Sequence, residues 1–162
     1  MRWILLVVVV LSACGASEDI SVDSKRRLVE LISSAGDLND PDTAAPLVSL
    51  EDFFEGNDDP GSIGCNLPGE VVPSEFYELF KSVRARSDVA DVVVQISMHD
   101  DPEGWPFSDT VWVITSATTA QVRSWVSERL APDDLFDGFH ADRPMATHPI
   151  PKGMRVVGLW YD

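Results

Sequence analysis

Few residues of this sequence have the chemistry of a catalytic site. Cys65 follows a glycine in a polar stretch, and His99 precedes Asp100 and Asp101. A thiol enzyme needs a nucleophile, a base within hydrogen-bond distance and a group that orients the base. These residues include the required types, but nothing in their spacing brings them together. We therefore expect no catalytic residue, and an enzyme that uses Cys65 and His99 stays as an alternative.

Two acidic stretches raise the question of calcium binding. They are "NDDPG" at 57–61 and "HDD" at 99–101, and calcium takes roughly six to eight oxygen ligands. With Glu55 as the first position of an EF-hand loop, Pro60 stands where glycine is needed and Asn66 where glutamate is needed. The sequence thus predicts no EF-hand, no metal ligand and no cofactor. A calcium-dependent protein with a site built from both loops is a further alternative.

The charge of the chain narrows the class of partner. The sequence has 12 basic and 27 acidic residues, which gives a formal net charge of -15. Such a chain repels nucleic acid and attracts basic surfaces, so we expect a basic protein partner and no nucleic acid. Aromatic side chains within an acidic rim can grip such a partner. The predicted partner-binding residues are Asp58, Asp59, Asp100, Asp101, Trp105 and Phe107. For the two aromatic residues, a loop that folds back onto its own core is an equal alternative.

The N-terminal segment has the order of a cleaved signal peptide. Arg2 precedes an apolar run over 3–11 that is too short to span a membrane. The tetrad Leu11-Ser12-Ala13-Cys14 then resembles the lipobox of bacterial lipoproteins. This resemblance implies cleavage before Cys14 and lipidation of its thiol. An ordinary secretory signal that happens to contain a cysteine is the alternative.

The lipobox defines the expected organisation of the chain. It implies a lipoprotein signal peptide over 1–13, a lipidated tether over 14–22 and a single domain over 23–162. Two or three acyl chains hold a protein stably at a membrane. We therefore expect an extracytoplasmic lipoprotein of the cell envelope, at the outer membrane if the bacterium has one. Cys65 then has no disulfide partner within the chain, so we predict that it is buried.

The periodicity of apolar residues predicts the elements of this domain. Helices are expected over 23–36, 73–86 and 118–131, and strands over 89–98, 110–117 and 154–162. The stretch 47–54 is assigned as a strand, although its apolar spacing also suits a helix. Residues 37–46, 55–70, 99–109 and 132–153 are expected to be a linker, a long loop, a hairpin tip and an irregular segment.

The predicted order gives the fold class. After the leading helix it reads β-α-β-β-α-β, which is the order of a ferredoxin-like α+β domain with an antiparallel sheet and helices on one face. The core of this domain is expected over about 45–162. Either the leading helix or the 131–153 segment could cover the second face of the sheet. Trp112 and Trp160 are expected to pack in the core.

Two stretches of the domain resemble known sequences. They are "SLEDFFEGNDDPGSIGCNL" at 49–67 and "WPFSDTVWVITSA" at 105–117. Together they resemble small acidic bacterial proteins without an assigned function, some of which look like immunity proteins of polymorphic toxin systems. The resemblance covers roughly residues 45–162 and implies a binding protein rather than an enzyme. The resulting hypothesis is a lipid-anchored, acidic, extracytoplasmic binding protein that resembles an immunity protein.

Overall fold

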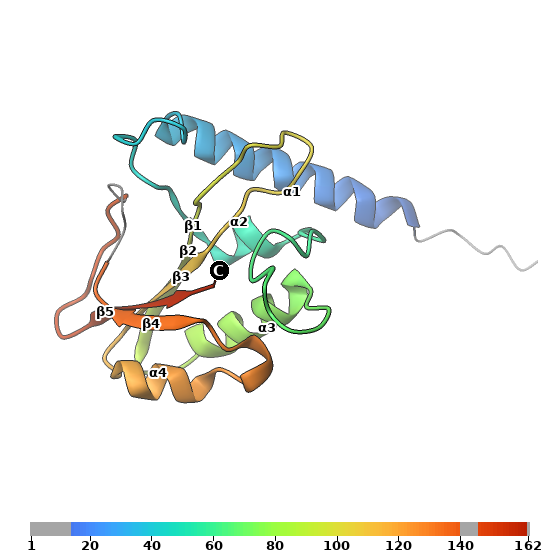
Figure 1. Cartoon of the computed structure of the whole chain (residues 1–162). Helices are drawn as coiled ribbons and strands as arrows, with labels where there is room; N and C mark the ends of the chain where they lie inside the picture. The colour runs from blue at the N-terminus through green and yellow to red at the C-terminus, as the bar shows by residue number, and fades with distance from the viewer. Residues whose placement is uncertain (1–13, 140–145, 162) are drawn as a thin grey trace, which may run out of the picture.

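The computed structural model describes residues 14–139 and 146–161, with side chains from residue 21 onward. Within these residues the fold is α+β, as expected, with one five-stranded antiparallel sheet in the order β1-β2-β3-β5-β4 and four α-helices (Figure 1). The elements are α1 (Cys14–Ala35), β1 (Leu47–Ser49), α2 (Leu50–Phe54), α3 (Pro73–Arg84), β2 (Val89–Gln95), β3 (Thr110–Thr115), α4 (Thr119–Trp125), the short 3-10 helix η1 (Glu128–Leu130), β4 (Asp134–Asp137) and β5 (Arg155–Trp160).

The strand order does not confirm a ferredoxin-like arrangement. In that arrangement another strand separates the two strands that a helix connects, whereas β1 pairs directly with β2 and lies at the edge of the sheet. The stretch 47–54, which we expected to be one strand, also differs from the prediction. Ser49 ends this strand because its side chain accepts a hydrogen bond from the backbone of Asp52 at 3.0 Å and starts α2. The stretch therefore forms a strand over Leu47–Ser49 and a helix over Leu50–Phe54.

Strand β4 lies in a segment that we expected to be irregular. Asp134–Asp137 pairs with β5 at the other edge of the sheet. Its apolar part is only Leu135 and Phe136, so the sequence shows no alternation long enough to indicate a strand. Charged residues at both ends are typical of an edge strand, since they oppose pairing with another chain.

The helices lie on one face of the sheet and share the larger core. Its members come from all four helices, from alternate positions of the central strands and from the loops that join them. The fully buried large side chains of this core include Leu28, Leu50, Phe53, Phe76, Phe80, Ile96 and Tyr161. The expectation that the helices lie on one face is therefore confirmed.

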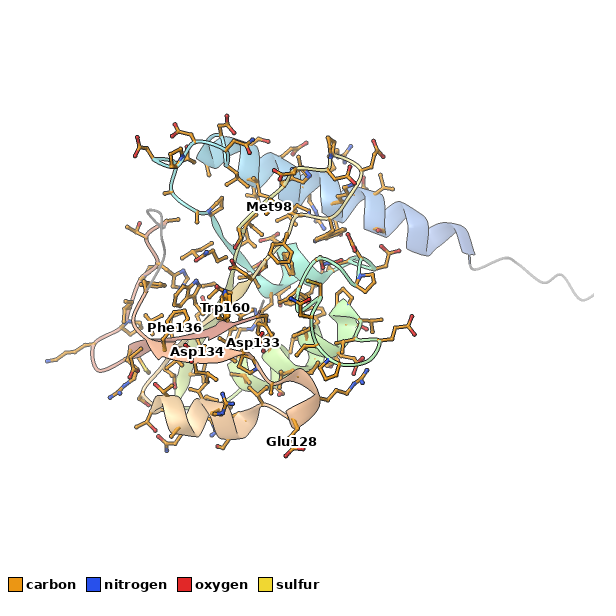
Figure 2. All side chains as sticks on the ribbon, viewed as in Figure 1. Met98, Glu128, Asp133, Asp134, Phe136 and Trp160 are labelled. Carbon is orange, nitrogen blue, oxygen red and sulfur yellow. The ribbon has the colours of Figure 1, made fainter. Side chains whose placement is uncertain are left out.

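A smaller core covers the second face of the sheet. Trp112 is fully buried there and makes edge-to-face contacts with Phe136 and Phe139, with ring centroids at 5.4 and 5.0 Å. Of the two alternatives for covering this face, the 131–153 segment is correct, because α1 packs into the other core. Figure 2 shows Phe136 and Trp160 on the neighbouring strands β4 and β5, and Trp160 is half-buried.

Gly158 allows these aromatic rings to approach the sheet. A Cβ atom at this position would lie 2.7 Å from a ring carbon of Trp112 and 2.5 Å from the nearest ring carbon of Phe136. No side chain larger than hydrogen fits between the two rings without displacing one of them. The sequence offered no indication of this role, because a glycine within a strand is explained equally well by a bulge.

Helix α1 begins earlier than expected. The stretch 14–22 was expected to be a tether, but the helix runs continuously from Cys14 to Ala35. No proline interrupts this stretch, and glycine occurs only at its second residue, so nothing stops the helix before Gly36. Val22 is 67% exposed and Leu31 44% exposed, whereas Leu28 and Ile32 are buried. Within the described part of the chain, no helix is long and apolar enough to span a bilayer. The predicted signal peptide at 1–13 lies outside the described residues.

The ends of the other helices follow local signals in part. A capping box begins α4, since the Thr118 side chain accepts from the backbone of Gln121 and the Gln121 side chain accepts from the backbone of Thr118. Helix α4 nevertheless ends at Trp125, earlier than expected, and η1 follows. Helix α3 begins at Pro73, whose fixed φ suits the first position of a helix.

Candidate functional site

The two acidic loops, 55–62 and 99–104, lie next to each other. Ile63 and Ser108 form a parallel β-bridge just beyond the loops, and the amide of Ser108 donates to the carbonyl of Ser62 at 2.9 Å. The amide of Trp105 donates to Oδ2 of Asp59 at 3.3 Å. These contacts join two regions that are more than 40 residues apart in the sequence. We call Asp58, Asp59, Asp100, Asp101 and Glu103 the acidic loop surface.

Buried polar residues fix the first loop. Asn57 is buried and donates to the carbonyl of Phe53 at 3.3 Å and to the hydroxyl of Ser62 at 3.0 Å. Its Oδ1 accepts from the amide of Asp59 at 3.1 Å, and Oδ1 of Asp59 accepts from the amide of Gly61 at 2.8 Å. The loop is therefore held by side chains that take the place of regular backbone pairing. Nothing in the sequence indicated that Asn57 and Ser62 hold the loop together.

The predicted binding residues divide between exposed acids and packed aromatic residues. Asp58, Asp100 and Asp101 are exposed, and Asp59 is half-buried. Trp105 is only 8% exposed and belongs to the core on the helical face, while Phe107 is half-buried and pairs with Met98 through the backbone. For Trp105 the structure thus favours the alternative in which the loop folds back onto its own core.

Two ring nitrogens of the hairpin are buried without a hydrogen-bond partner among the described residues. They are Nε1 of Trp105 and Nε2 of His99. The indole nitrogen is a donor only, so it offers nothing to a cation. An imidazole nitrogen such as Nε2 of His99 is a common metal ligand, but among the described residues no group of three or more His, Cys, Asp or Glu side chains is arranged to hold a metal ion.

Helix α1 holds both acidic loops in place. The hydroxyl of Ser21 donates to the carbonyl of Gly56 at 2.7 Å, and Nζ of Lys25 donates to the carbonyl of Glu103 at 2.6 Å. Figure 2 places Met98, at the base of the hairpin tip, on the α1 side of the molecule and well away from Trp160. The leading helix is therefore part of the structure that positions the loops, a role that its sequence did not indicate.

Cys65 is exposed, so the prediction that it is buried is wrong. The preceding residue, Gly64, has φ 61°, and a Cβ atom there would lie 2.7 Å from the ring of Phe76. The glycine backbone therefore covers the Phe76 ring, and the chain carries the Cys65 side chain outward. His99 is half-buried. Within residues 14–139 and 146–161 no group of three or more His, Cys, Asp or Glu side chains is arranged to hold a metal ion.

Two arginine residues of the helical face are ion-paired with acids outside the acidic loop surface. Arg84 makes a two-pronged ion pair with Glu51, and Arg129 makes one with Glu75. These arginine side chains hold the pKa of Glu51 and of Glu75 below the usual value for glutamate, chiefly by hydrogen bonding. None of the ion pairs between described residues involves a carboxylate of the acidic loop surface. The carboxylates of that surface are therefore not ion-paired within the described chain, and the nearby cation Lys25 contacts the carbonyl of Glu103 rather than a carboxylate.

Comparisons with known proteins identify the family of this chain. The sequence model of the uncharacterized protein YfbO family matches residues 23–159. A relative described as "Uncharacterized protein YfbO" from Escherichia coli (strain K12) is 44% identical over 136 residues, which is 84% of this chain and 96% of the relative. No solved structure matches the chain. The family match begins at residue 23, so the predicted signal peptide and Cys14 precede it. The chain therefore belongs to the YfbO family, which confirms the expected resemblance to bacterial proteins without an assigned function.

Proposed function

We propose that this protein is a lipid-anchored, extracytoplasmic binding protein that uses its acidic loop surface to bind a basic protein. It acts by covering a surface of its partner, as an immunity protein does, rather than by catalysing a reaction. The proposal is based mainly on one observation. The hydrogen bond between Asp59 and Trp105 joins the two acidic loops into one surface.

The sequence before the family domain supports the anchor. Cys14 follows a short apolar run and small residues in the order of a lipobox, and it is also the first residue of α1. A diacylated cysteine would then lead directly into a helix that is part of the domain. Two acyl chains are sufficient for stable attachment to a membrane.

The charge distribution supports a basic partner. The carboxylates of the acidic loop surface take part in no ion pair with a described cation, and Asp58, Asp100 and Asp101 are exposed to solvent. Complementary charge of this kind accelerates association and selects partners more than it increases affinity. A partner with a compact basic patch would therefore associate quickly at low salt and more slowly at high salt.

Metabolic labelling tests the anchor. Cells that express the full chain are fed an alkyne-tagged fatty acid, and the protein is recovered from membrane and soluble fractions. We expect the label on wild-type protein in the membrane fraction and its loss in Cys14→Ser. The matched control is Cys65→Ser, which changes the other cysteine and should keep the label. Equal labelling of wild type and Cys14→Ser would refute the anchor.

A cross-linking experiment with matched variants tests the binding surface. The variant Asp58→Asn/Asp100→Asn removes two exposed charges of the acidic loop surface. The control variant Asp42→Asn/Glu30→Gln removes two exposed charges elsewhere. A basic envelope protein should be captured by wild type and by the control, and capture by the loop variant should fall at least tenfold. Equal capture by both variants, or capture that does not weaken with salt, would contradict the proposal.

We do not propose the two alternatives, a calcium-dependent protein and a thiol enzyme. A calcium site would need several oxygen ligands in one place, and the described acidic side chains form no such group. A thiol enzyme would need a base held beside Cys65, and neither the spacing nor the exposure of this residue indicates one.

A further inference from the structure

The first acidic loop contacts the N-terminal half of α1, and the second contacts the middle of this helix. Ser21 contacts Gly56 of the first loop, and Lys25 contacts Glu103 of the second. The N-terminal end of α1 extends past the other described elements, as Figure 1 shows. The helix thus connects the predicted lipidation site to both loops without an intervening flexible segment.

The rise of the helix limits the distance between the loops and the anchor. Ser21 is seven residues and Lys25 eleven residues after Cys14, so they lie about 10 and 16 Å along the helix axis. These lengths are upper limits to the height of the two residues above Cys14, because any tilt of the helix brings them closer to the membrane. The opposite end of α1, at Ala35, lies about 30 Å from Cys14 along the axis.

A second acidic segment lies at the other end of α1 and can be compared with the acidic loop surface. Asp37, Asp40 and Asp42 lie in the turns that follow the C-terminal end of α1. An upright helix would hold this segment away from the membrane, while it holds the acidic loop surface near the membrane. The fold therefore distinguishes two acidic regions that look equivalent in the sequence.

We propose that α1 is a rigid spacer that holds the acidic loop surface next to the lipid headgroups, and that the partner is a membrane-associated protein whose basic residues lie at the bilayer surface. The inference rests on the proposed function, since it assumes the anchor at Cys14 and the role of the acidic loops. It adds the height at which the partner is bound. A soluble basic protein that approaches from the far side of the domain would not reach this surface.

Fluorescence quenching in vesicles tests this placement. A genetically encoded fluorescent amino acid replaces Asp100 in one variant and Ser116 in another, and the lipidated proteins are reconstituted with a phospholipid that carries a nitroxide on its headgroup. Ser116 is exposed and follows β3, which runs away from the hairpin, so it is the distant control. We expect quenching at position 100 to exceed that at position 116 by severalfold. Equal quenching, or stronger quenching at 116, would overturn the placement.

A spacer variant tests directly whether the length of α1 sets the height of the loops. Inserting seven helix-forming residues between residues 17 and 18 lengthens α1 by about 10 Å and restores nearly the same helical face. Quenching at position 100 should then fall toward that at 116, and cross-linking to a membrane-associated partner should fall with it. Unchanged quenching would show that α1 does not set the height of the loops.

Failure of the anchor gives a different result. An unlipidated protein would not float with the vesicles, which would refute the proposed anchor. In that event, a chain beginning at Cys14 and carrying Cys65→Ser is coupled through Cys14 to a maleimide lipid, and the same comparison of positions 100 and 116 tests the geometry of α1 alone.

Discussion

Replacing Asp59 with alanine should loosen the contact between the two acidic loops. The substitution removes the acceptor for the amide of Trp105, at 3.3 Å, and for the amide of Gly61, at 2.8 Å. A hydrogen bond to a charged group contributes about 1.5–3 kcal/mol when it is short and shielded. The bond to Trp105 is long and that to Gly61 is exposed, so we expect Asp59→Ala to lower the free energy of unfolding by about 1–2 kcal/mol in total.

Two assays measure this effect at different scales. The midpoint of urea unfolding gives the global loss, and hydrogen exchange of the Trp105 amide gives the local one. A loss of about 1.4 kcal/mol in local protection corresponds to tenfold faster exchange. The control is Asp58→Ala, which removes a neighbouring exposed carboxylate and should change stability by less than about 0.5 kcal/mol. Exchange at Trp105 that is the same in both variants would refute the bridge between the loops.

Three further predictions concern the core, one ion pair and the effect of calcium. Gly158→Ala should destabilise the fold by about 1–3 kcal/mol in urea unfolding, because its Cβ would overlap Trp112 and Phe136; stability equal to wild type would refute the tight packing. The pKa of Glu51 is lowered mainly by its hydrogen bond to Arg84, so the stabilising contribution of this pair is complete above the ordinary value of 4.5 and is lost as the pH falls through the lowered pKa. Glu51→Gln should therefore destabilise the protein at pH 7 more than at pH 3, and an equal effect at both would contradict this assignment. Millimolar calcium or a chelator should leave the melting temperature unchanged, and a rise with calcium would revive the calcium alternative.

The strong apolar patterns were enough to predict most of the fold. Val92, Val94 and Ile96 alternate as a strand should, and Phe76, Phe80 and Val83 repeat at helical spacing. Both patterns gave the correct type of element because burial imposes a period on the chain. The stretch 47–54 has both periods, so only the cap formed by Ser49 decides where the strand ends and the helix begins.

The order of the strands and the burial of the loop residues could not be predicted from periodicity. Strand β4 is two apolar residues between aspartates, and its pairing with β5 depends on contacts distant in sequence. The burial of Trp105 and the exposure of Cys65 depend on the path of two irregular loops, which Asn57, Asp59 and Gly64 determine through local hydrogen bonds and backbone geometry. Composition correctly indicated acidic loops, but only the structure shows that they meet beside α1.

The most direct test of the account is mass spectrometry of the N-terminal peptide of protein purified from the membrane fraction. We predict that the mature chain begins at Cys14 and carries a diacylglyceryl group on its sulfur. A chain that retains residues 1–13, or one that begins at an unmodified Cys14 and is recovered in the soluble fraction, would contradict the central claim.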